Sequence, residues 1–258
     1  MSETGASARC CVAGGGPAGM MLGLCLARAG VDVLVLEKHV DFPAFRLWMQ
    51  AEVTGLIEES GRVTGVHVMT ADGPRVVRAH LVVAADGRSS LVREKAALAV
   101  EELGAPMDVL WFRLSRRSDD AAETMARFDA GRVFIMINRG EYWQCGYVIA
   151  KGALDETRQG GLGAFRQRVR ALAPFAADRV GELRSWDDVK LLTVRVDRAR
   201  QWYRPGLLCI GDAAHAMSPV GGVGINLAIQ DAVAAANRLA APLREGRVTI
   251  AHLRAVQR

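Results

Sequence analysis

The first forty residues carry two short apolar runs, with helix signals between them. Residues 9–13 and 31–36 are mostly apolar, as are strands buried on both faces of a parallel sheet. Between them, Pro17 suits the first turn of a helix, where its missing N–H costs nothing, and Gly30 suits the position that ends a helix. The pattern predicts a strand, a helix and a second strand, which together form a βαβ unit.

The remainder of the chain predicts further strands around a few helices. Apolar runs at 81–85 and 207–210 are typical of buried strands, and a helix is expected over about 225–239. Further strands are expected at 45–53, 62–69 and 75–79 as a small meander and at 108–114, 132–138, 142–150 and 189–196, with a hairpin turn at 139–141 and a helix at 162–172. This mixture of strands and helices predicts an α/β fold.

Three glycines between the first strand and the first helix have the spacing of a dinucleotide-binding loop. Gly14 allows a tight turn, Gly16 lets the backbone approach a pyrophosphate, and Gly19 lets helix and strand pack closely. Glu37 follows Gly19 by 18 residues, at the end of the second strand, where a carboxylate accepts both ribose hydroxyls of an adenosine. A solvated strand end is the alternative for Glu37. Because this acid would repel a 2′-phosphate, the loop favours FAD or NAD over NADP.

Composition narrows the function classes. The chain of 258 residues has 33 Lys+Arg against 28 Asp+Glu, a net charge of +5 that suits an anionic cofactor and not a nucleic-acid partner. Its five cysteines form no CxxC and no Cys/His cluster, so we expect no metal site and a reducing, cytoplasmic location. Glycines interrupt the apolar stretch 12–27, and no run reaches the ~18 apolar residues that an integral membrane segment needs.

Asp86 and Gly87 follow the strand expected at 81–85. Ser89 or Ser90 can cap the helix that comes next. Asp-Gly after a strand is also a common turn, so a structural and a functional interpretation of the pair are equally open.

A second glycine-rich segment follows the strand expected at 207–210. Asp212 stands at the carboxyl end of that strand, where open α/β sheets bind ligands. Gly221, Gly222 and Gly224 open the next helix, whose N-terminal N–H groups would stabilise negative charge on a reduced flavin. An NAD-dependent dehydrogenase needs no second element of this kind, so the two segments together favour FAD.

The motifs GGGPAGM, VVAADGRSS and LLCIGDAAHAMSPVGGVGINLAIQDA resemble the FAD-dependent aromatic hydroxylases of the p-hydroxybenzoate hydroxylase type, and ubiquinone-pathway hydroxylases are similar. The resemblance covers most of both ends of the chain. It implies an α/β fold in which residues 1–103 and 203–258 form a Rossmann-like FAD-binding domain. Residues 104–202 would form an inserted substrate domain with a mixed β-sheet. It also implies that NAD(P)H reduces the flavin and that one atom of O2 is transferred to a small phenolic or other aromatic substrate.

The resemblance assigns roles to particular residues. The glycine-rich loop matches the diphosphate-binding segment, Glu37 the ribose-binding acid, Asp212 the acid that bonds the ribitol chain, and Pro219 a residue close to the flavin ring. His215 lies inside this motif, and a structural role is favoured over that of a base. The expected cofactor-binding positions are Gly14, Gly16, Pro17, Ala18, Gly19, Glu37, Lys38, Asp86, Gly87, Gly211, Asp212, Pro219, Gly222, Gly224, Ile225 and Asn226. The positions expected to serve catalysis at the flavin ring are Pro219, Gly222 and Asn226.

The chain is shorter than the family pattern after its second strand. Only seven residues separate Glu37 from Phe45, too few for a helical crossover, so Asp41–Pro43 would join the meander directly. The family continues beyond the position of Arg258 with further helices. A less enclosed flavin would release hydrogen peroxide more readily, and a missing pocket wall could be supplied by a homo-oligomer.

Three hypotheses for the function therefore stand. The chain is an FAD-dependent monooxygenase, a shortened relative that binds FAD weakly without turnover, or an NAD-dependent oxidoreductase. The second glycine-rich segment counts against the last of these.

Aromatic residues in the middle of the chain have two interpretations. Trp111, Phe134, Trp143 and Tyr147 stand in expected strands and could line one wall of a substrate pocket. Aromatic residues in sheets more often belong to the core, and that interpretation is favoured here.

Overall fold

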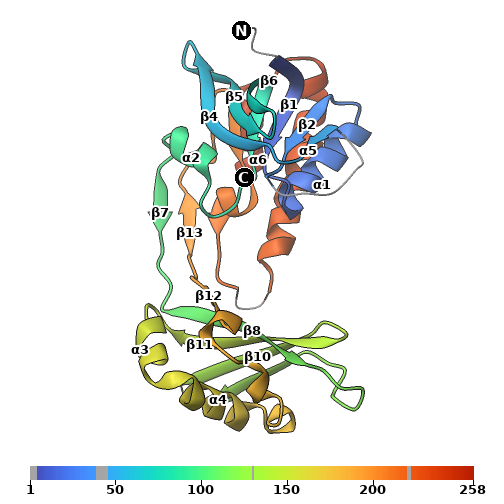
Figure 1. The fold of residues 1–258 in the computed structure, drawn as a ribbon. Helices are drawn as coiled ribbons and strands as arrows, with labels where there is room; N and C mark the ends of the chain where they lie inside the picture. Colours follow the sequence, from blue (N-terminus) through green and yellow to red (C-terminus); the bar gives the residue numbers. More distant parts are fainter. Residues whose placement is uncertain (1–4, 39–45, 130, 220–221) are drawn as a thin grey trace. The chain divides into compact units, whose positions relative to one another are not determined.

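The chain forms two compact units in a computed structural model, which describes residues 5–38, 46–129, 131–219 and 222–258 (Figure 1). Unit 1 combines the chain up to Leu103 with Arg195–Arg258, and unit 2 is Gly104–Val194. The middle segment expected at 104–202 thus ends eight residues earlier, at Val194. The reason is that β13 (Asp197–Ala199) pairs with β7 (Val100–Glu102) inside unit 1.

Unit 1 is built on an eight-stranded sheet in which β15, β6, β1, β2 and β3 run parallel. The expected first strand, helix and second strand are present, and Gly30 ends the helix with a φ of +74°. The strands of this sheet are β1 (Gly5–Ala13), β2 (Val33–Leu36), β3 (Arg46–Trp48), β4 (Glu52–Glu59), β5 (Arg62–Thr70), β6 (Gly73–Ala84), β14 (Tyr203–Arg204) and β15 (Leu207–Cys209). A small separate sheet joins β7 and β13 to β16 (His215–Ala216).

The meander expected from 45 to 79 is correct only in its later part. Strands β4, β5 and β6 pair as consecutive antiparallel neighbours, as a meander does. Strand β4 only begins where the strand expected at 45–53 was to end, and the strands expected at 75–79 and 81–85 form the single strand β6. However, β3 pairs parallel to β2, with Leu34 opposite Arg46 and Leu36 opposite Trp48. The expectation that a parallel return needs a helix was therefore wrong. The nine residues 37–45 can reach about 30 Å, whereas β2 has only four residues, about 13 Å.

Helices cover one face of the parallel sheet, and the β4–β5 hairpin with a short helix covers the other. The first layer consists of α1 (Pro17–Arg28), α5 (Gly224–Arg244) and α6 (Ile250–Gln257), whose apolar side chains share one core with β1, β2, β6 and β15. On the second face, α2 (Leu91–Lys95) and the hairpin enclose a core that includes Cys11, Val82 and Cys209. Both faces of β1 and β6 are therefore buried, which explains their continuous apolar runs.

Unit 2 is a five-stranded sheet with helices packed on one face. Its order is β12-β8-β11-β10-β9, and every pairing is antiparallel, whereas a mixed sheet was expected. Short hairpin connections such as the turn at Gly140, φ +87°, join neighbours that run in opposite directions. The expected strand at 189–196 is reduced to β12. The elements of unit 2 are β8 (Met107–Ser115), β9 (Met125–Asp129), β10 (Arg132–Asn138), β11 (Tyr142–Ala150), α3 (Leu154–Gln159), α4 (Gly161–Leu172) and β12 (Lys190–Leu192).

Three of the four aromatic residues considered for a pocket wall belong to the core of unit 2. Phe134, Trp143 and Tyr147 are buried, and the Tyr147 ring meets that of Phe165 from α4 edge-to-face at 5.4 Å. Strand alternation turns Trp111 to the opposite face of the sheet, where it is half-buried. The core interpretation therefore holds for Phe134, Trp143 and Tyr147, whereas Trp111 lies outside this core.

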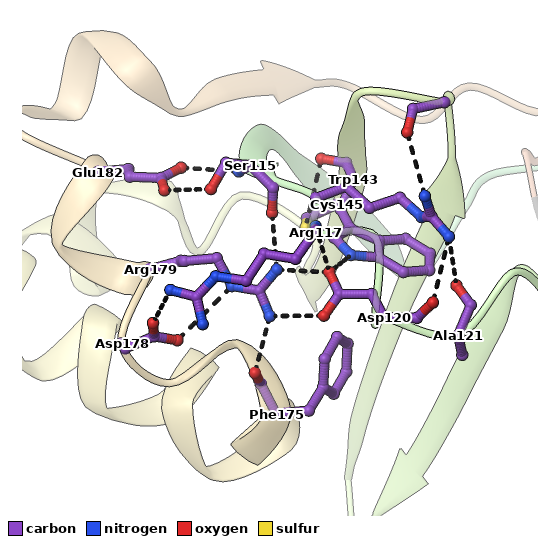
Figure 2. Close-up of polar contacts among 12 residues, drawn as sticks. Ser115, Arg117, Asp120, Ala121, Trp143, Cys145, Phe175, Asp178, Arg179 and Glu182 are labelled. Atoms are coloured by element: carbon purple, nitrogen blue, oxygen red, sulfur yellow. Dashed lines mark hydrogen bonds and ion pairs between the residues drawn. The ribbon is translucent and has the colours of Figure 1, made fainter.

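A buried ion pair fixes the loops at one end of unit 2 (Figure 2). Arg179 donates to Asp120 Oδ2 at 2.5 Å and to Oδ1 at 2.9 Å, and the indole N–H of Trp143 donates to the same carboxylate at 2.8 Å. The hydrogen bonds from Arg179 outweigh burial and hold the pKa of Asp120 well below its usual range. Arg179 also donates to the carbonyl of Phe175 at 2.7 Å, so the pair links the β8–β9 connection to the segment after α4.

Candidate functional site

A pocket of about 330 Å³ opens at the carboxyl ends of β1, β2 and β6. Ligands bind at this edge of parallel α/β sheets, because the strand-to-helix loops converge there. The pocket brings together the glycine-rich loop, the acid after β2 and the Asp-Gly pair after β6. Its lining residues are Ala13, Gly14, Gly16, Leu36, Glu37, Lys38, Ala51, Glu52, Val53, Ala85, Asp86, Gly87, Ser89 and Leu91.

The three motif glycines differ in what surrounds them. Gly14 has a φ of +104°, and a Cβ there would lie 2.8 Å from the backbone nitrogen of Asp86. A Cβ on Gly19 would overlap the carbonyl oxygen of Gly14, so α1 approaches the loop too closely for any side chain. At Gly16 a Cβ would meet nothing within 4 Å. Gly14 and Gly19 therefore shape the loop, while Gly16 leaves open space where a ligand can approach the backbone.

Glu37 turns its carboxylate toward the glycine-rich loop. Its Oε2 accepts a hydrogen bond of 2.6 Å from the backbone N–H of Gly15. The acid after β2 is thus held against the loop within the pocket, and a carboxylate retains lone pairs for ligand hydroxyls in addition to this bond. Glu37 is therefore hydrogen-bonded to the loop and is not simply a solvated strand end.

Asp86 is engaged with the helix that follows it. Its Oδ1 accepts from Ser90 Oγ at 2.5 Å and its Oδ2 from the backbone N–H of Val92 at 3.2 Å. Ser90 caps α2 by accepting from the backbone N–H of Arg93 at 3.0 Å, as expected for one of the two serines. The Asp86 carboxylate therefore fixes the start of α2, while Asp86 and Gly87 both line the pocket.

The turn that carries Asp212 lies against the start of α1. A Cβ on Gly211, whose φ is +57°, would lie 3.2 Å from the Cβ of Ala18 and 3.1 Å from that of Ala228 on α5. Arg88 lies 3.9 Å from Asp212 Oδ2 and connects this turn with the loop after β6. The two glycine-rich segments, distant in sequence, therefore meet around the N-terminus of α1.

Two residues without an expected role hold this turn. Asp231 on α5 accepts a 2.8 Å hydrogen bond from the backbone N–H of Gly211. The buried Arg93 donates to the carbonyls of Ala213 at 3.1 Å and Arg88 at 3.0 Å. Sequence reasoning missed both residues. The sequence offered one signal for Asp231, because this acid lies close to Ala228 and Ala232 on the buried side of α5.

His215 is paired with the same aspartate. Its Nε2 lies 2.7 Å from Asp231 Oδ2, and its ring lies at 39° to that of Trp202, with the ring centroids 4.9 Å apart. Burial lowers the pKa of His215, but the hydrogen bond and charge of Asp231, with the charge of Asp212, outweigh it and raise the pKa. His215 and Asp231 thus form a hydrogen-bonded clamp on the Gly211–Ala213 turn, consistent with the structural role favoured for this histidine.

The segment expected around a flavin ring is exposed at the start of α5. Pro219 accepts a 3.0 Å hydrogen bond from the backbone N–H of Gly222, which has a φ of +65°. Ile225 is 57% exposed, and Asn226 also faces solvent. None of these residues, nor Asp212, lines the 330 Å³ pocket. Gly221 and Asp41–Pro43 lie outside the described residues.

Other kinds of site find little support in the part of the chain that the structure describes. There, no group of three or more His, Cys, Asp or Glu side chains is placed to hold a metal ion. Burial raises the pKa of Cys11, Cys145 and Cys209 to about 12, so these thiols are not nucleophiles at neutral pH. Among the same residues, no helix combines the length and apolar character needed to cross a membrane.

Comparison with known sequences gives matches over most of the chain. The family described as FAD binding domain matches residues 7–44 and 41–253. The 6-methylpretetramide 4-monooxygenase of Streptomyces rimosus is 40% identical over 205 residues, 78% of this chain and 48% of that protein. Ubiquinone hydroxylase UbiL of Rhodospirillum rubrum is 28% identical over 236 residues, 90% of this chain and 52% of that protein. The chain thus spans about half the length of these relatives.

Solved structures share the fold. PqsL from Pseudomonas aeruginosa, described as a probable FAD-dependent monooxygenase, gives a TM-score of 0.80 at 17% identity, covering 97% of this chain and 91% of that one. The anhydrotetracycline hydroxylase OxyS from Streptomyces rimosus gives a TM-score of 0.71 at 18% identity, covering 97% of this chain and 65% of that one. The likeness confirms the expected α/β fold class.

Proposed function

This chain belongs to the FAD-binding-domain family, as its resemblance to the aromatic hydroxylases led us to expect, and from that premise we propose an FAD-dependent monooxygenase that hydroxylates a small aromatic molecule. The observation that carries the proposal is the pocket at the carboxyl ends of β1, β2 and β6, where Gly16 faces open space and Glu37 is held against the loop. The names of the relatives, among them a 6-methylpretetramide monooxygenase and a ubiquinone hydroxylase, support the reaction class.

The residues present fit the adenosine diphosphate part of FAD. The open side of Gly16 and the N-terminus of α1 suit the diphosphate, because the free N–H groups of a helix N-terminus favour an anion. Glu37 suits the ribose hydroxyls, with Lys38 beside it at the pocket rim. We assign Gly14, Gly19, Pro17 and Ala18 to shaping this loop, and Asp86 and Gly87 to the pocket wall.

The second glycine-rich segment is assigned to the rest of the cofactor. Gly211 brings Asp212 to the start of α1, where its carboxylate would accept ribitol hydroxyls. Pro219, Gly222 and Asn226, with Gly224 and Ile225, are assigned to the flavin ring, and the N-terminus of α5 favours negative charge there. When bound, FAD would supply the redox chemistry, taking electrons from NAD(P)H and activating O2 for transfer of one oxygen atom.

Unit 2 is assigned the role of substrate domain. Its sheet has one face covered by helices, while the other presents half-buried apolar side chains such as Trp111, Ile135 and Val148. An apolar surface of this kind suits an aromatic substrate. The same proposal includes a phenolic or other aromatic substrate and NADH or NADPH as the source of electrons.

The first experiment is a visible absorption spectrum of the purified protein after incubation with FAD and desalting. We expect oxidised-flavin bands that survive desalting. Glu37→Gln should weaken FAD binding about tenfold or more, because hydrogen bonds to a charged acceptor contribute about 1.5–3 kcal/mol. Glu52→Gln is the matched control, since Glu52 lines the same pocket but is exposed on β4. A native protein that stays colourless, or equal losses in both variants, would contradict the assignment of the pocket.

The second experiment tests the reaction. The FAD-loaded protein is given NADH or NADPH with phenolic substrates, and hydroxylated product and hydrogen peroxide are both measured. Product formed in proportion to NAD(P)H consumed supports the monooxygenase. Peroxide without product, or no NAD(P)H oxidation by a flavin-loaded protein, would leave FAD binding intact and overturn the hydroxylation.

A further inference from the structure

A second pocket, of about 600 Å³, lies on unit 1 away from the proposed flavin site. No residue lines both pockets. Strand β1 contributes Ser7–Arg9 to this pocket and Ala13 to the other, about 13 Å further along the strand. The lining residues are Ser7, Ala8, Arg9, Asp32, Glu59, Arg62, Thr64, Arg78, Ala79, His80, Gly246 and Val248.

The two carboxylates of the pocket each have an arginine of their own. Asp32 is bound by Arg46 at 2.7 Å, and Glu59 by Arg78. Their negative charge is therefore already compensated by side chains other than Arg9 and Arg62.

Arg9 and Arg62 bracket His80 without a carboxylate partner among the described residues. Arg9 Nη1 lies 3.4 Å from Nε2 and 3.5 Å from Nδ1 of the His80 ring, and Arg62 donates to the His80 carbonyl at 2.8 Å. Gly246 closes the pocket beside them, since a Cβ there would lie 3.1 Å from Arg9 Nη1. One guanidinium group thus lies against the His80 imidazole and a second is bound to the backbone carbonyl of the same residue, in a concave site.

Electrostatics in this pocket favour an anion. Burial lowers the pKa of His80, and the charges of Arg9 and Arg62 lower it further. Arg78 also faces the pocket, but it is neutralised by Glu59, as Asp32 is by Arg46. An oxyanion beside these two guanidinium groups, which have no carboxylate partner among the described residues, would relieve their repulsion and would let His80 protonate as a third donor.

We propose that this pocket binds an oxyanion, either a phosphate monoester or a carboxylate, through Arg9, Arg62 and His80. Guanidinium forks match both groups because two parallel N–H donors meet two oxygens. The site is separate from FAD binding, so it is a second ligand site of the protein.

The test follows the His80 imidazole by NMR in the native protein, with its signal assigned by His80→Gln. Inorganic phosphate and acetate are titrated separately against sodium chloride at equal ionic strength. Phosphate should raise the pKa of His80 by about 1, with a dissociation constant in the low millimolar range or below. Acetate acting more strongly than phosphate would identify the ligand as a carboxylate. An unchanged pKa with both, an equal effect of chloride, or saturation only near molar phosphate (an adventitious ion only) would overturn the proposal.

Charge variants separate a built site from general attraction. Arg9→Gln and Arg62→Gln should each weaken phosphate binding about tenfold, whereas Arg238→Gln removes an exposed cation of α5 outside the pocket and should change it less than twofold. Equal losses in all three variants would contradict the site. Phosphate at the glycine-rich loop would not move the His80 signal, so failure here and failure of the flavin assignment are distinguishable. The titration of the native protein remains decisive if a variant does not fold.

Discussion

Replacing each motif glycine by alanine should separate the fold of the glycine-rich loop from its ligand contact. Gly19→Ala forces a methyl group into the Gly14 carbonyl, and such overpacking costs about 1–3 kcal/mol. In Gly14→Ala the new Cβ would lie 2.8 Å from the backbone nitrogen of Asp86. A side chain at a φ of +104° also costs about 1–2 kcal/mol in addition to this overlap. We therefore expect the free energy of unfolding to fall by about 2 kcal/mol in Gly19→Ala and about 3 kcal/mol in Gly14→Ala. These losses correspond to a decrease of about 4–12 °C in Tm.

Gly16→Ala should behave differently. Its φ of −68° and ψ of −178° suit alanine, and its Cβ would meet no atom within 4 Å. Loss of the preferred N-cap glycine is offset by reduced freedom of the unfolded chain, so stability should change by less than about 1 kcal/mol. FAD binding should weaken at least about tenfold, or 1.4 kcal/mol, because the methyl group occupies the space needed by the diphosphate.

The assay combines urea unfolding without FAD and FAD titration by flavin fluorescence on all three variants. The expected result is a fold-competent Gly16→Ala protein with impaired binding beside destabilised Gly14→Ala and Gly19→Ala proteins. The reasoning is refuted if Gly16→Ala unfolds as readily as Gly19→Ala, or if it binds FAD as tightly as the native protein.

Three further predictions concern single interactions. Asp120→Ala should cost about 3–5 kcal/mol in urea unfolding, because it leaves the buried Arg179 with only the half-exposed Asp178, 3.6 Å away, as a carboxylate partner; a loss under 1 kcal/mol would contradict this. Ser90→Ala should cost about 1 kcal/mol through loss of the α2 cap, measured as a shift in Tm. Because the pKa of His215 is raised in the folded protein, its protonation stabilises the fold. This stabilisation is fully present below the usual pKa of 6.5 and is lost as pH rises through the pKa of the folded state. Asp231→Asn should therefore flatten stability against pH above 6.5, and an unchanged slope would contradict the clamp.

Local chemistry made the first βαβ unit predictable. Pro17 and Gly30 bound α1 as their backbone preferences require, and the steric demand on Gly19 comes from the carbonyl of Gly14 in the same loop. The α5 start at Gly224 and the Ser90 cap were predictable for the same reason. In each case the determining contacts lie within a few residues along the chain, or within one loop.

What could not be predicted depends on contacts between distant segments. The parallel pairing of β3 with β2 depends on which edge of the sheet is free, and no local signal encodes that. Asp231 and Arg93 gain their roles only when α5 and α2 pack around the Gly211–Ala213 turn. The extent of unit 1 beyond Arg195 likewise depends on β13 finding β7 across nearly a hundred residues.

Unit 1 is assembled from both ends of the chain, and this has a consequence for its synthesis. Strand β6 must wait for its partner β15 until the whole of unit 2 has been made. At about 5–20 residues per second, translating residues 104–194 leaves that edge of the sheet without β15 for on the order of 5–20 s. The nascent sheet also lacks α5 during this interval, so Leu81 and Val83 present apolar surface. Unit 2 is contiguous and can close on the ribosome, whereas unit 1 presents an unpaired strand edge and apolar surface, both prone to aggregation, until β15 and α5 have been made.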